Sequence, residues 1–449
     1  MIRHEDWKKA IDDRRVRIGI IGMGYVGLPL ALTFAERGFP VAGFDVDPDK
    51  VRRLNAADSY ILHIPSSRIA ALRKAGRFKA TADFSRLRES DAILICVPTP
   101  LDAHEVPDLT YIEQTGHSIA KTLRPGQLVI LESTTYPGTT AELLRGILEA
   151  TGLHAPAPAR RARGDFLLAF SPEREDPGNA KFSTHTIPKV VGADDDWSRR
   201  AAVALYQSIV PTVVPVSSTR VAESCKLLEN IYRCVNIALV NEMKMIFDRM
   251  GIDVWEVIAA ASTKPFGFQP FYPGPGLGGH CIPLDPFYLS WKARESGAYA
   301  RFIELAGEVN KGMPEYVIHR TIDAMNRRGK ALKGARVLVL GVAYKEDVDD
   351  MRESPACEII ELLRSRGARV DYSDPHIPRI PSIRAHPGLA GMRSVLLTPA
   401  NLRRYDAALI VTNHSAFDVE NIVRHSRLVV DTRNATANAR TGRKNIARA

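Results

Sequence analysis

The chain has 449 residues, of which 45% are apolar and 25% charged, and its formal net charge is +10. This length predicts two or three domains, because a single core stops growing at roughly 250–300 residues. No stretch approaches the roughly 20 apolar residues of a membrane span, and residues 1–15 lack the apolar centre of a signal peptide, so we expect a cytoplasmic protein. The basic residues are dispersed without a nucleic-acid-binding motif, which leaves phosphorylated small molecules as candidate ligands.

The cysteines are odd in number and form no Cys-x-x-Cys pair: Cys96, Cys225, Cys234, Cys281 and Cys357. Such spacing argues against both a disulfide framework and a zinc site. We therefore expect reduced thiols and no metal centre.

A Gly-rich motif follows the first predicted strand, residues 16–21. Gly22, Gly24 and Gly27 fit GxGxxG at the start of a predicted helix, and Asp45 ends the next predicted strand. In this strand–turn–helix context the spacing predicts a dinucleotide site, where the glycines admit a pyrophosphate to the helix N-terminus. The Asp45 carboxylate would bind the adenosine ribose and repel a 2′-phosphate, so the expected cofactor is NAD rather than NADP.

Later apolar runs end in polar residues, as the carboxyl edge of a parallel sheet does. These runs are 91–100, 127–140, 165–175 and 189–193. We therefore expect Thr99, Thr134 and Glu173 to face the nicotinamide crevice. The Pro-, Ala- and Arg-rich segment 154–164 is expected to be a solvated loop, and we assign it no function.

From residue 217 the pattern becomes helical. Ser and Thr residues can cap this helix, its apolar residues keep a helical period, and Gly251 can end it. Lys226, Asn230 and Arg233 share one helical face. A polar face on a largely apolar helix favours a binding wall, with a solvated face as the alternative.

The segment 274–286, GPGLGGHCIPLDP, combines four glycines with Cys281. Glycine lets the backbone bend and approach a ligand closely, and the prolines Pro283 and Pro286 oppose a helix, so we expect a loop. A cysteine in such a loop, with Asp285 four residues on, indicates a reactive thiolate. The alternative is a small buried cysteine beside a turn.

A second strand-led unit begins at residue 333, with further strands within 367–375, 405–414 and 427–433. Its first turn, GVAYKE, lacks GxGxxG, so no second dinucleotide is expected there. The C-terminal tail after these strands is expected to be frayed. The predicted fold class is therefore α/β, with two doubly wound Rossmann-like domains joined by a long central helix.

Several motifs occur in one order over residues 16–434: GMGYVGL, VPTP, ESTTYPGTT, SPEREDPG, the Lys226–Asn230 pair, GGHCIPLD and DDMRESPA. Together they resemble the nucleotide-sugar 6-dehydrogenases, the family of UDP-glucose and GDP-mannose dehydrogenases. Within that family the chain is most similar to the bacterial UDP-N-acetylglucosamine 6-dehydrogenases of surface polysaccharide pathways, such as lipopolysaccharide synthesis.

The resemblance implies an N-terminal NAD-binding domain over 1–215 and a central helical domain over 216–330, with the dimer interface and the catalytic Cys loop. It further implies a C-terminal UDP-sugar-binding domain over 331–449 and a homodimer or higher homo-oligomer. The implied NAD contacts are Tyr25, Val26, Asp45, Lys50, Thr99, Thr134 and Arg352. The implied nucleotide-sugar site is lined by Arg174, Lys226, Asn230, Arg233, Tyr272, Gly274, Tyr344 and Lys345.

Two departures from the UDP-glucose branch make glucose a less expected sugar. Pro177 replaces the second glutamate of the branch's SPE motif. The arginine that the branch sends across the dimer is not evident either, and Lys264 is the nearest basic residue.

The resemblance also implies a four-electron oxidation that uses two NAD molecules. Cys281 would capture the aldehyde as a thiohemiacetal and become a thioester after the second hydride transfer. Lys226 and Asn230 would stabilise the developing oxyanion.

Three residues would handle protons and water in this reaction. Asp285 would position water or Lys226, or act as the base of the alcohol step. Glu173 would activate the hydrolytic water, which Thr134 would hold. How Lys226, Asp285 and Glu173 divide the proton transfers stays open.

Other functions compete with this interpretation. The sugar could instead be UDP-glucose or UDP-GalNAc. A two-electron hydroxyacid dehydrogenase would share the NAD domain but would not need the thiol of Cys281. A non-catalytic NAD-binding protein would have no reason to combine that thiol with Lys226 and Asn230.

Overall fold

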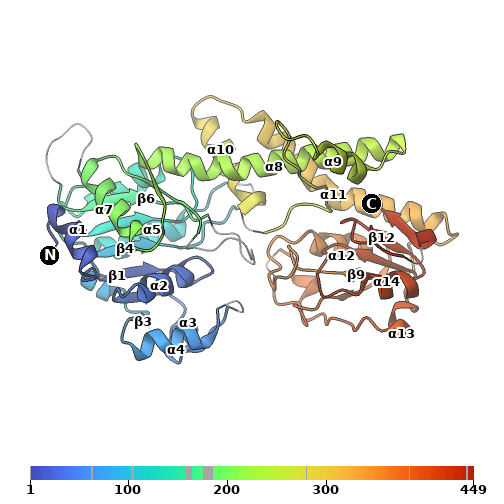
Figure 1. The fold of residues 1–449 in the computed structure, drawn as a ribbon, viewed down its shortest axis with the longest axis horizontal. Helices are drawn as coiled ribbons and strands as arrows, with labels where there is room; N and C mark the ends of the chain where they lie inside the picture. Colours follow the sequence, from blue (N-terminus) through green and yellow to red (C-terminus); the bar gives the residue numbers. More distant parts are fainter. Residues whose placement is uncertain are drawn as a thin grey trace. The chain divides into compact units, whose positions relative to one another are not determined.

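The computed structural model describes residues 2–61, 64–102, 106–156, 164–174, 186–279, 281–383, 385–440 and 443–449. The chain divides into two compact units, Met1–Glu229 with Phe287–Ala298, and Asn230–Pro286 with Tyr299–Ala449. Each unit contains a sheet with helices around it (Figure 1). The predicted α/β class with two doubly wound domains is therefore confirmed, whereas the division into 1–215, 216–330 and 331–449 stays a prediction.

The first unit, in its described residues, holds an eight-stranded sheet in the order β3-β2-β1-β4-β5-β6-β7-β8. Its strands are β1 Ile18–Ile21, β2 Val41–Phe44, β3 Phe78–Thr81, β4 Ala92–Ile95, β5 Leu128–Leu131, β6 Leu167–Phe170, β7 Lys189–Gly192 and β8 Val213–Val216. The order 3-2-1-4-5-6 is that of dinucleotide-binding folds. Neighbouring strands are parallel except that β7 runs antiparallel to β6, with Phe170 opposite Gly192. The sequence predicted that the strand within 189–193 is parallel to its neighbours, because the pattern of apolar residues along a strand does not show its direction.

Helices cover both faces of this first sheet. They are α1 Trp7–Asp12, α2 Gly27–Glu36, α3 Pro48–Asn55, α4 Ser66–Lys74, α5 Thr110–Ala120, α6 Arg145–Glu149 and α7 Asp196–Gln207, with short helices at His4–Asp6, Phe84–Glu89 and Thr139–Leu144. Ile18 and Ile20 pack on the side of α2 and α7, whereas Ile21 packs on the side of α5. This alternation follows from the two-residue period of a strand.

The second unit holds a parallel five-stranded sheet in its described residues, ordered β10-β9-β11-β12-β13. The strands are β9 Arg336–Leu340, β10 Arg369–Ser373, β11 Ala407–Ile410, β12 Val429–Asp431 and β13 Ile446–Arg448. Counted from β9, this is the flavodoxin-like order 2-1-3-4-5, which is also doubly wound. The helices are α9 Val254–Ala261, α11 Arg301–Asn326, α12 Pro355–Ser365, α13 Pro399–Leu402 and α14 Val419–His425, with short helices at Pro387–Leu389 and Arg443–Asn445. Helix α10, Cys281–Glu295, begins in this unit and ends in the first.

The prediction of a frayed C-terminal tail is wrong for the residues that the structure describes there. Strand β13 pairs in parallel with β12, and the backbone N–H of Ala449 donates to the carbonyl of Asp431 at 2.9 Å. The guanidinium of Arg320 also donates to the carbonyl of Arg448. Without β13, β12 would present an edge of unpaired backbone groups, which favours the added strand.

Two helices contain residues at which the chain passes from one unit to the other. The long helix predicted from residue 217 is confirmed as α8, Thr219–Met250, and Gly251 ends it with φ 72°. The prediction of a loop at Cys281 is wrong, because α10 begins at that residue and continues through Pro283 and Pro286. Pro283 lies in the first turn, where its missing N–H has no intrahelical partner in any case. Within the described residues, no helix is both long and apolar enough to cross a membrane.

Candidate active site

The Gly-rich turn after β1 needs glycine for two different reasons. Gly22 has φ 92°, and a Cβ there would lie 2.4 Å from the carbonyl oxygen of Cys96. A Cβ on Gly27 would lie 1.9 Å from the carbonyl oxygen of Gly22, whereas a Cβ on Gly24 would meet nothing within 4 Å. The N-terminus of α2, at Val26, has no side-chain cap. The open space beside Gly24 and the start of α2 fit the pyrophosphate of NAD.

Asp45 is fixed beside this turn at the end of β2. It is buried, and its carboxylate accepts hydrogen bonds from the backbone N–H groups of Met23 at 2.8 Å and Asp47 at 3.0 Å. The ammonium of Lys50 lies 3.5 Å from the same carboxylate. Tyr25, also predicted to contact NAD, is half-buried in the turn. The predicted ribose-binding acid is thus held rigidly against the Gly-rich turn.

Thr99, Thr134 and Glu173 follow β4, β5 and β6, so they lie at the same carboxyl edge of the first sheet. The structure brings two of them into contact, since Thr99 Oγ1 donates to the carbonyl of Thr134 at 2.8 Å. The hydroxyl of Tyr288 donates to the carbonyl of Thr99. Tyr288 is buried and was missed from the sequence, because only the fold brings it to this edge.

The predicted polar face of α8 divides by burial. Lys226 and Asn230 are buried, whereas Arg233 is exposed. The Asn230 amide donates to Oδ2 of Asp285 at 2.5 Å, so two predicted catalytic residues meet. Of the predicted catalytic set, Thr134, Glu173 and Lys226 belong to the first unit, and Asn230, Cys281 and Asp285 to the second.

Cys281 is the first residue of α10 and is half-buried. All five cysteines of the chain lie outside disulfides, as expected. The first turn of a helix favours negative charge, which suits a thiolate at this position. Asp285 lies about one turn further along the same helix and is buried.

The glycines before Cys281 make close contacts with the protein itself. A Cβ on Gly274 would lie 2.4 Å from a guanidinium nitrogen of Arg433, and a Cβ on Gly278 or Gly279 would lie within 2.9 Å of the Tyr344 side chain. The Gly279 N–H donates to the carbonyl of Arg352 at 3.1 Å. Tyr344, a predicted substrate residue, thus packs against the segment that contains Gly274, another predicted substrate residue. The glycines of this segment are needed for packing as well as for access of a ligand.

Arg433 is a candidate binding residue that the sequence interpretation missed. It follows β12, and its Nε donates to the carbonyl of Val411 at 3.1 Å. Burial lowers the pKa of Arg433 to about 10, against the opposing effect of Asp431 and Glu346. A half-buried guanidinium beside a Gly-rich segment suits an anionic ligand. The strand-end rule that selected Thr99 could have selected Arg433 as well.

Arg174, a predicted substrate residue, is held by Glu229 of α8. Its Nη2 lies 2.6 Å from Oε1 of Glu229, and its Nη1 donates to the carbonyl of Pro188 at 2.7 Å. The guanidinium is therefore fixed between a helix and the residue before β7.

The other predicted residues of the second unit are more accessible. Tyr272 is 55% exposed and stacks on Trp255 with ring centroids 5.7 Å apart. Lys345 is half-buried, and the exposed Arg352 pairs with Asp350 at 2.7 Å. Their roles toward NAD or the sugar nucleotide stay predictions.

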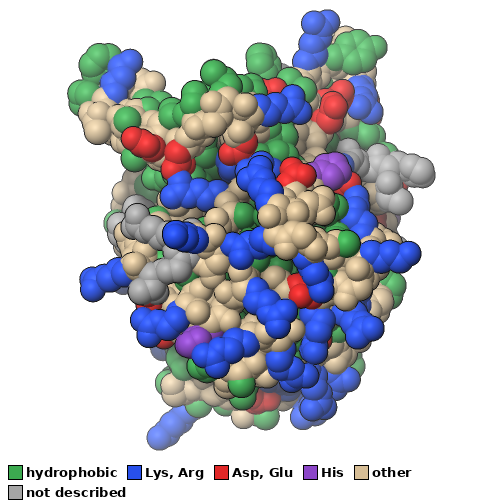
Figure 2. All heavy atoms as spheres, turned by 90° about the vertical axis from the view of Figure 1, so that its right-hand side faces the viewer, with side chains coloured by type: hydrophobic (Ala, Val, Ile, Leu, Met, Phe, Trp, Pro, Cys, Tyr) green, Lys and Arg blue, Asp and Glu red, His purple; other side chains and the backbone are tan. Residues whose placement is uncertain are grey.

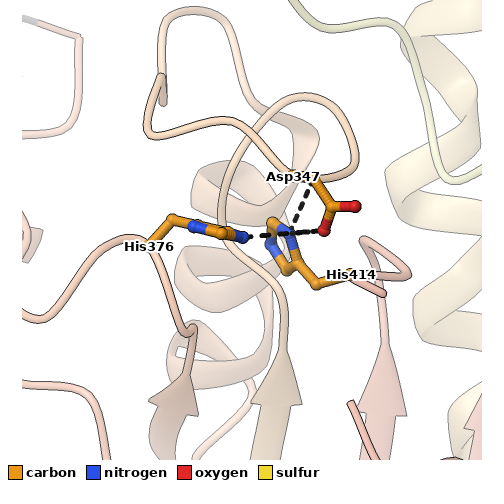
Figure 3. Close-up of side chains that lie close together, drawn as sticks. All are labelled: Asp347, His376 and His414. Atoms are coloured by element: carbon orange, nitrogen blue, oxygen red, sulfur yellow. Dashed lines mark hydrogen bonds and ion pairs between the residues drawn. The ribbon is translucent and has the colours of Figure 1, made fainter. Parts of the chain in front are cut away.

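A cluster of Asp347, His376 and His414 lies at the carboxyl edge of the second sheet (Figure 3). His376 Nε2 lies 3.6 Å from Asp347 Oδ1. His414 Nδ1 accepts the backbone N–H of Asp347 at 3.0 Å, and its Nε2 lies 3.0 Å from Oδ2 of the buried Asp374. Hydrogen bonds occupy both nitrogens of His414. We therefore interpret the cluster as a hydrogen-bond network that holds the loop of residues 344–345, rather than as a metal site.

Two features of the sequence lie outside the described residues. They are Pro177 and most of the segment 154–164, of which 157–163 is not described. The positive net charge is visible in Figure 2, where Lys and Arg side chains predominate over Asp and Glu on the face drawn. Such a surface favours anionic ligands.

Comparison with known families matches three consecutive domains of the UDP-glucose/GDP-mannose dehydrogenase family. The NAD binding domain matches residues 16–210, the central domain 220–312 and the UDP binding domain 338–438. These matches confirm the resemblance inferred from the motifs and the expected NAD cofactor, and they support a UDP-sugar substrate.

Individual relatives cover nearly the whole chain. The chain is 35% identical to UDP-N-acetyl-D-glucosamine 6-dehydrogenase of Pseudomonas aeruginosa over 90% of this chain and 91% of the relative. It is 35% identical to NDP-N-acetyl-D-galactosaminuronic acid dehydrogenase of Ralstonia solanacearum over 95% of this chain and 97% of the relative. Its structure is similar to a UDP-D-ManNAc dehydrogenase of Pyrococcus horikoshii, with a TM-score of 0.84 and 31% identity over 96% and 98% of the two chains. The chain therefore belongs to the UDP-glucose/GDP-mannose dehydrogenase family of NAD-dependent nucleotide-sugar dehydrogenases.

Proposed function

We propose that the protein oxidises C6 of UDP-N-acetyl-D-glucosamine from the alcohol to the carboxylate, for surface polysaccharide biosynthesis in the cytoplasm, as a homodimer or higher homo-oligomer. The proposed chemistry rests on Cys281 at the start of α10 and on the hydrogen bond between Asn230 of α8 and Asp285 in the first turns of α10. The N-acetylhexosamine in the name of the Pseudomonas aeruginosa relative supports the choice of sugar.

The overall reaction converts one alcohol, two NAD⁺ and one water into one carboxylate, two NADH and three protons. NAD accepts the two hydrides. The residues that would hold it are those of the Gly-rich turn together with Asp45 and Lys50, which lie on one side of the sheet edge formed by Thr99 and Thr134.

Cys281 provides the nucleophile for the second half of the reaction. Its sulfur adds to the aldehyde carbon and forms a thiohemiacetal, and loss of the second hydride leaves a thioester on Cys281. The Lys226 ammonium and the Asn230 amide stabilise the oxyanion that develops on the sugar oxygen, an electrostatic effect of about 3–4 kcal/mol per donor in other enzymes.

Water and protons are handled by carboxylates and a hydroxyl. Asp285 orients Asn230 and acts as a base in the alcohol step, and Glu173 takes a proton from the water that attacks the thioester. Thr134 holds that water at the sheet edge. Lys226 shares the proton transfers with these two carboxylates.

Charged and aromatic side chains would bind the sugar nucleotide. Arg433, Lys345, Arg174 and Arg233 offer positive charge for the diphosphate, while Tyr272, Tyr344 and Gly274 shape the site.

An NADH-production screen with purified protein tests the proposal. UDP-GlcNAc should give the highest kcat/KM among UDP-GlcNAc, UDP-GalNAc, UDP-ManNAc, UDP-glucose and GDP-mannose, with two NADH per sugar and an acid product by mass spectrometry. The names of the Ralstonia solanacearum and Pyrococcus horikoshii relatives make the galacto and manno isomers the second candidates. A higher kcat/KM for any other sugar would overturn the substrate assignment, and one NADH per sugar would indicate a two-electron dehydrogenase.

A further inference from the structure

A buried cluster of charges lies directly beneath Glu173. The carboxylate of Glu132, which follows β5, has no exposed surface, and the ammonium of Lys189, the first residue of β7, lies 2.6 Å from its Oε2. The hydroxyl of Tyr206, on α7, donates to the other oxygen of Glu132. A lysine side chain only 10% exposed is uncommon unless it is paired.

The direction of β7 places this lysine opposite Glu173. Strand β7 is antiparallel to β6, with Phe170 opposite Gly192. When this register is continued past the end of β6, Glu173 lies opposite Lys189. Between these two residue pairs, Ser171 Oγ donates a hydrogen bond to the carbonyl of Val190. The Lys189 ammonium accordingly lies 3.6 Å from Oε2 of Glu173.

Lys189 is the cation of a cluster whose other members are acidic or neutral. Burial opposes its charge, but the carboxylates of Glu132 and Glu173 outweigh burial and raise the pKa of Lys189. Burial raises the pKa of the Cys96 thiol, just after β4, and of the Tyr206 phenol, so both stay protonated. Lys189 thus supplies positive charge to two carboxylates at once.

We propose that Lys189 is a positioning residue for Glu173, whose carboxylate it orients at the sheet edge for the hydrolysis of the thioester. This inference rests on the proposed function, in which Glu173 activates water.

The step that depends on Lys189 is the last one of the reaction. Water attacks the thioester carbonyl carbon, the new C–O bond forms, and the C–S bond breaks to release the Cys281 thiolate. Glu173 accepts one proton of the water, and ionisation of the acid product releases the other. A base must lie within hydrogen-bond reach of the water from which it accepts this proton. Without Lys189, the Glu173 carboxylate would lose the cation that lies 3.6 Å from its Oε2.

A purely structural role for Lys189 makes a different prediction. The lysine would then serve only to neutralise Glu132, and replacing both by neutral residues should have no effect on hydrolysis. Removing Lys189 alone would leave a buried carboxylate without its cation and risk unfolding. The informative pair is therefore Glu132→Gln, which keeps Lys189, and the double variant Glu132→Gln/Lys189→Met, which removes both charges.

The experiment is a rapid-quench single turnover with NAD and UDP-GlcNAc, followed by NADH absorbance and intact mass. Wild type and Glu132→Gln should form two NADH and release acid at similar rates. In the double variant the two NADH should form at the Glu132→Gln rate, while hydrolysis slows about 10- to 100-fold at pH 7 and acyl-enzyme accumulates on Cys281. Lys189→Arg, which keeps the charge, should retain the wild-type rate of hydrolysis.

Each contrary result points to a different error. If the double variant hydrolyses the thioester at the rate of Glu132→Gln, Lys189 has no role toward Glu173. A slower formation of NADH without accumulated acyl-enzyme would place the effect on oxidation and also overturn the inference. One NADH per sugar from wild type would refute the proposed function itself, and this inference with it.

Discussion

The side-chain amide of Asn230 donates a hydrogen bond to Oδ2 of Asp285 at 2.5 Å, which joins α8 to the first turns of α10. Both side chains are at least 97% buried. A buried carboxylate needs such donors, so this bond fixes the turn that begins at Cys281.

Asn230→Ala should therefore impair both stability and catalysis. The substitution leaves the buried Asp285 without this donor, which should cost about 1–3 kcal/mol of unfolding free energy. Loss of an oxyanion donor should also lower kcat by roughly 10²-fold or more. Chemical denaturation and NADH kinetics measure the two effects. Asn236→Ala is the matched control, because the amide of Asn236 donates within α8 to the carbonyl of Tyr232. Equal effects of the two substitutions would contradict the special role of Asn230.

The glycines of the turn after β1 should separate folding from NAD binding. Gly27→Ala places a Cβ 1.9 Å from the carbonyl oxygen of Gly22 and should destabilise the first unit by several kcal/mol, on the order of other overpacked sites. Gly24→Ala meets no protein atom within 4 Å, so the melting temperature should change little. Its methyl group enters the space for the pyrophosphate, and we expect NAD affinity to fall about 10-fold or more. Calorimetry with and without NAD checks both, and tight NAD binding by Gly24→Ala would be incompatible with this placement.

Asp45 should determine the choice of cofactor. Its carboxylate lies beside the Gly-rich turn where the ribose would bind, and it is 3.5 Å from Lys50. Wild type should prefer NAD strongly, whereas Asp45→Ala should narrow the ratio of kcat/KM between NAD and NADP, because the negative charge is gone and Lys50 is released to attract a phosphate. Equal efficiency with both cofactors in wild type would rule out this role.

Cys281 should be required for the second oxidation more than for the first. Cys281→Ala should lose formation of the acid and keep the affinities for NAD and UDP-sugar near those of wild type. Cys281→Ser should stall as a slowly hydrolysed ester that intact mass detects, since a serine alkoxide is a poorer leaving group. Alkylation of wild type should abolish activity, with UDP-sugar giving protection. Acid production by Cys281→Ala at the wild-type rate would require abandoning the covalent mechanism.

Glu223 should make stability depend on pH. Its carboxylate accepts hydrogen bonds from the backbone of Gly138 and Thr140 and from the Thr140 hydroxyl. Burial nevertheless raises the pKa of Glu223 to about 7 from its ordinary 4.5. The folded state then binds this proton more tightly than the unfolded chain does. Stability from this group is therefore full below pH 4.5 and falls as the pH rises to about 7, by at most about 3 kcal/mol.

Melting temperatures of wild type and Glu223→Gln between pH 4.5 and 8 check this dependence. Glutamine cannot ionise, so the variant should show a smaller decline over that interval. Parallel curves for the two proteins would show that Glu223 is ionised throughout.

Features with a local cause could be predicted from the sequence. The turn at Gly22 and the acid at Asp45 follow from one strand–turn–helix motif, whose spacing is set by the length of its elements. Helix α8 was predictable because capping residues, a helical period and Gly251 are contiguous in the chain. The edge positions of Thr99 and Thr134 followed from the rule that parallel strands end on one side.

Features that depend on distant pairing were decided only by the tertiary structure. The sequence could not show that β7 runs antiparallel to β6, because apolar alternation has no direction, yet this pairing sets Lys189 opposite Glu173. Likewise, Arg433 lies beside Gly274 only because a strand end and a Gly-rich segment distant in sequence fold together. Local patterns fix which backbone conformations are favourable, whereas the burial of charges and the pairing of strand edges depend on the whole fold, whose packing free energy outweighs local preference.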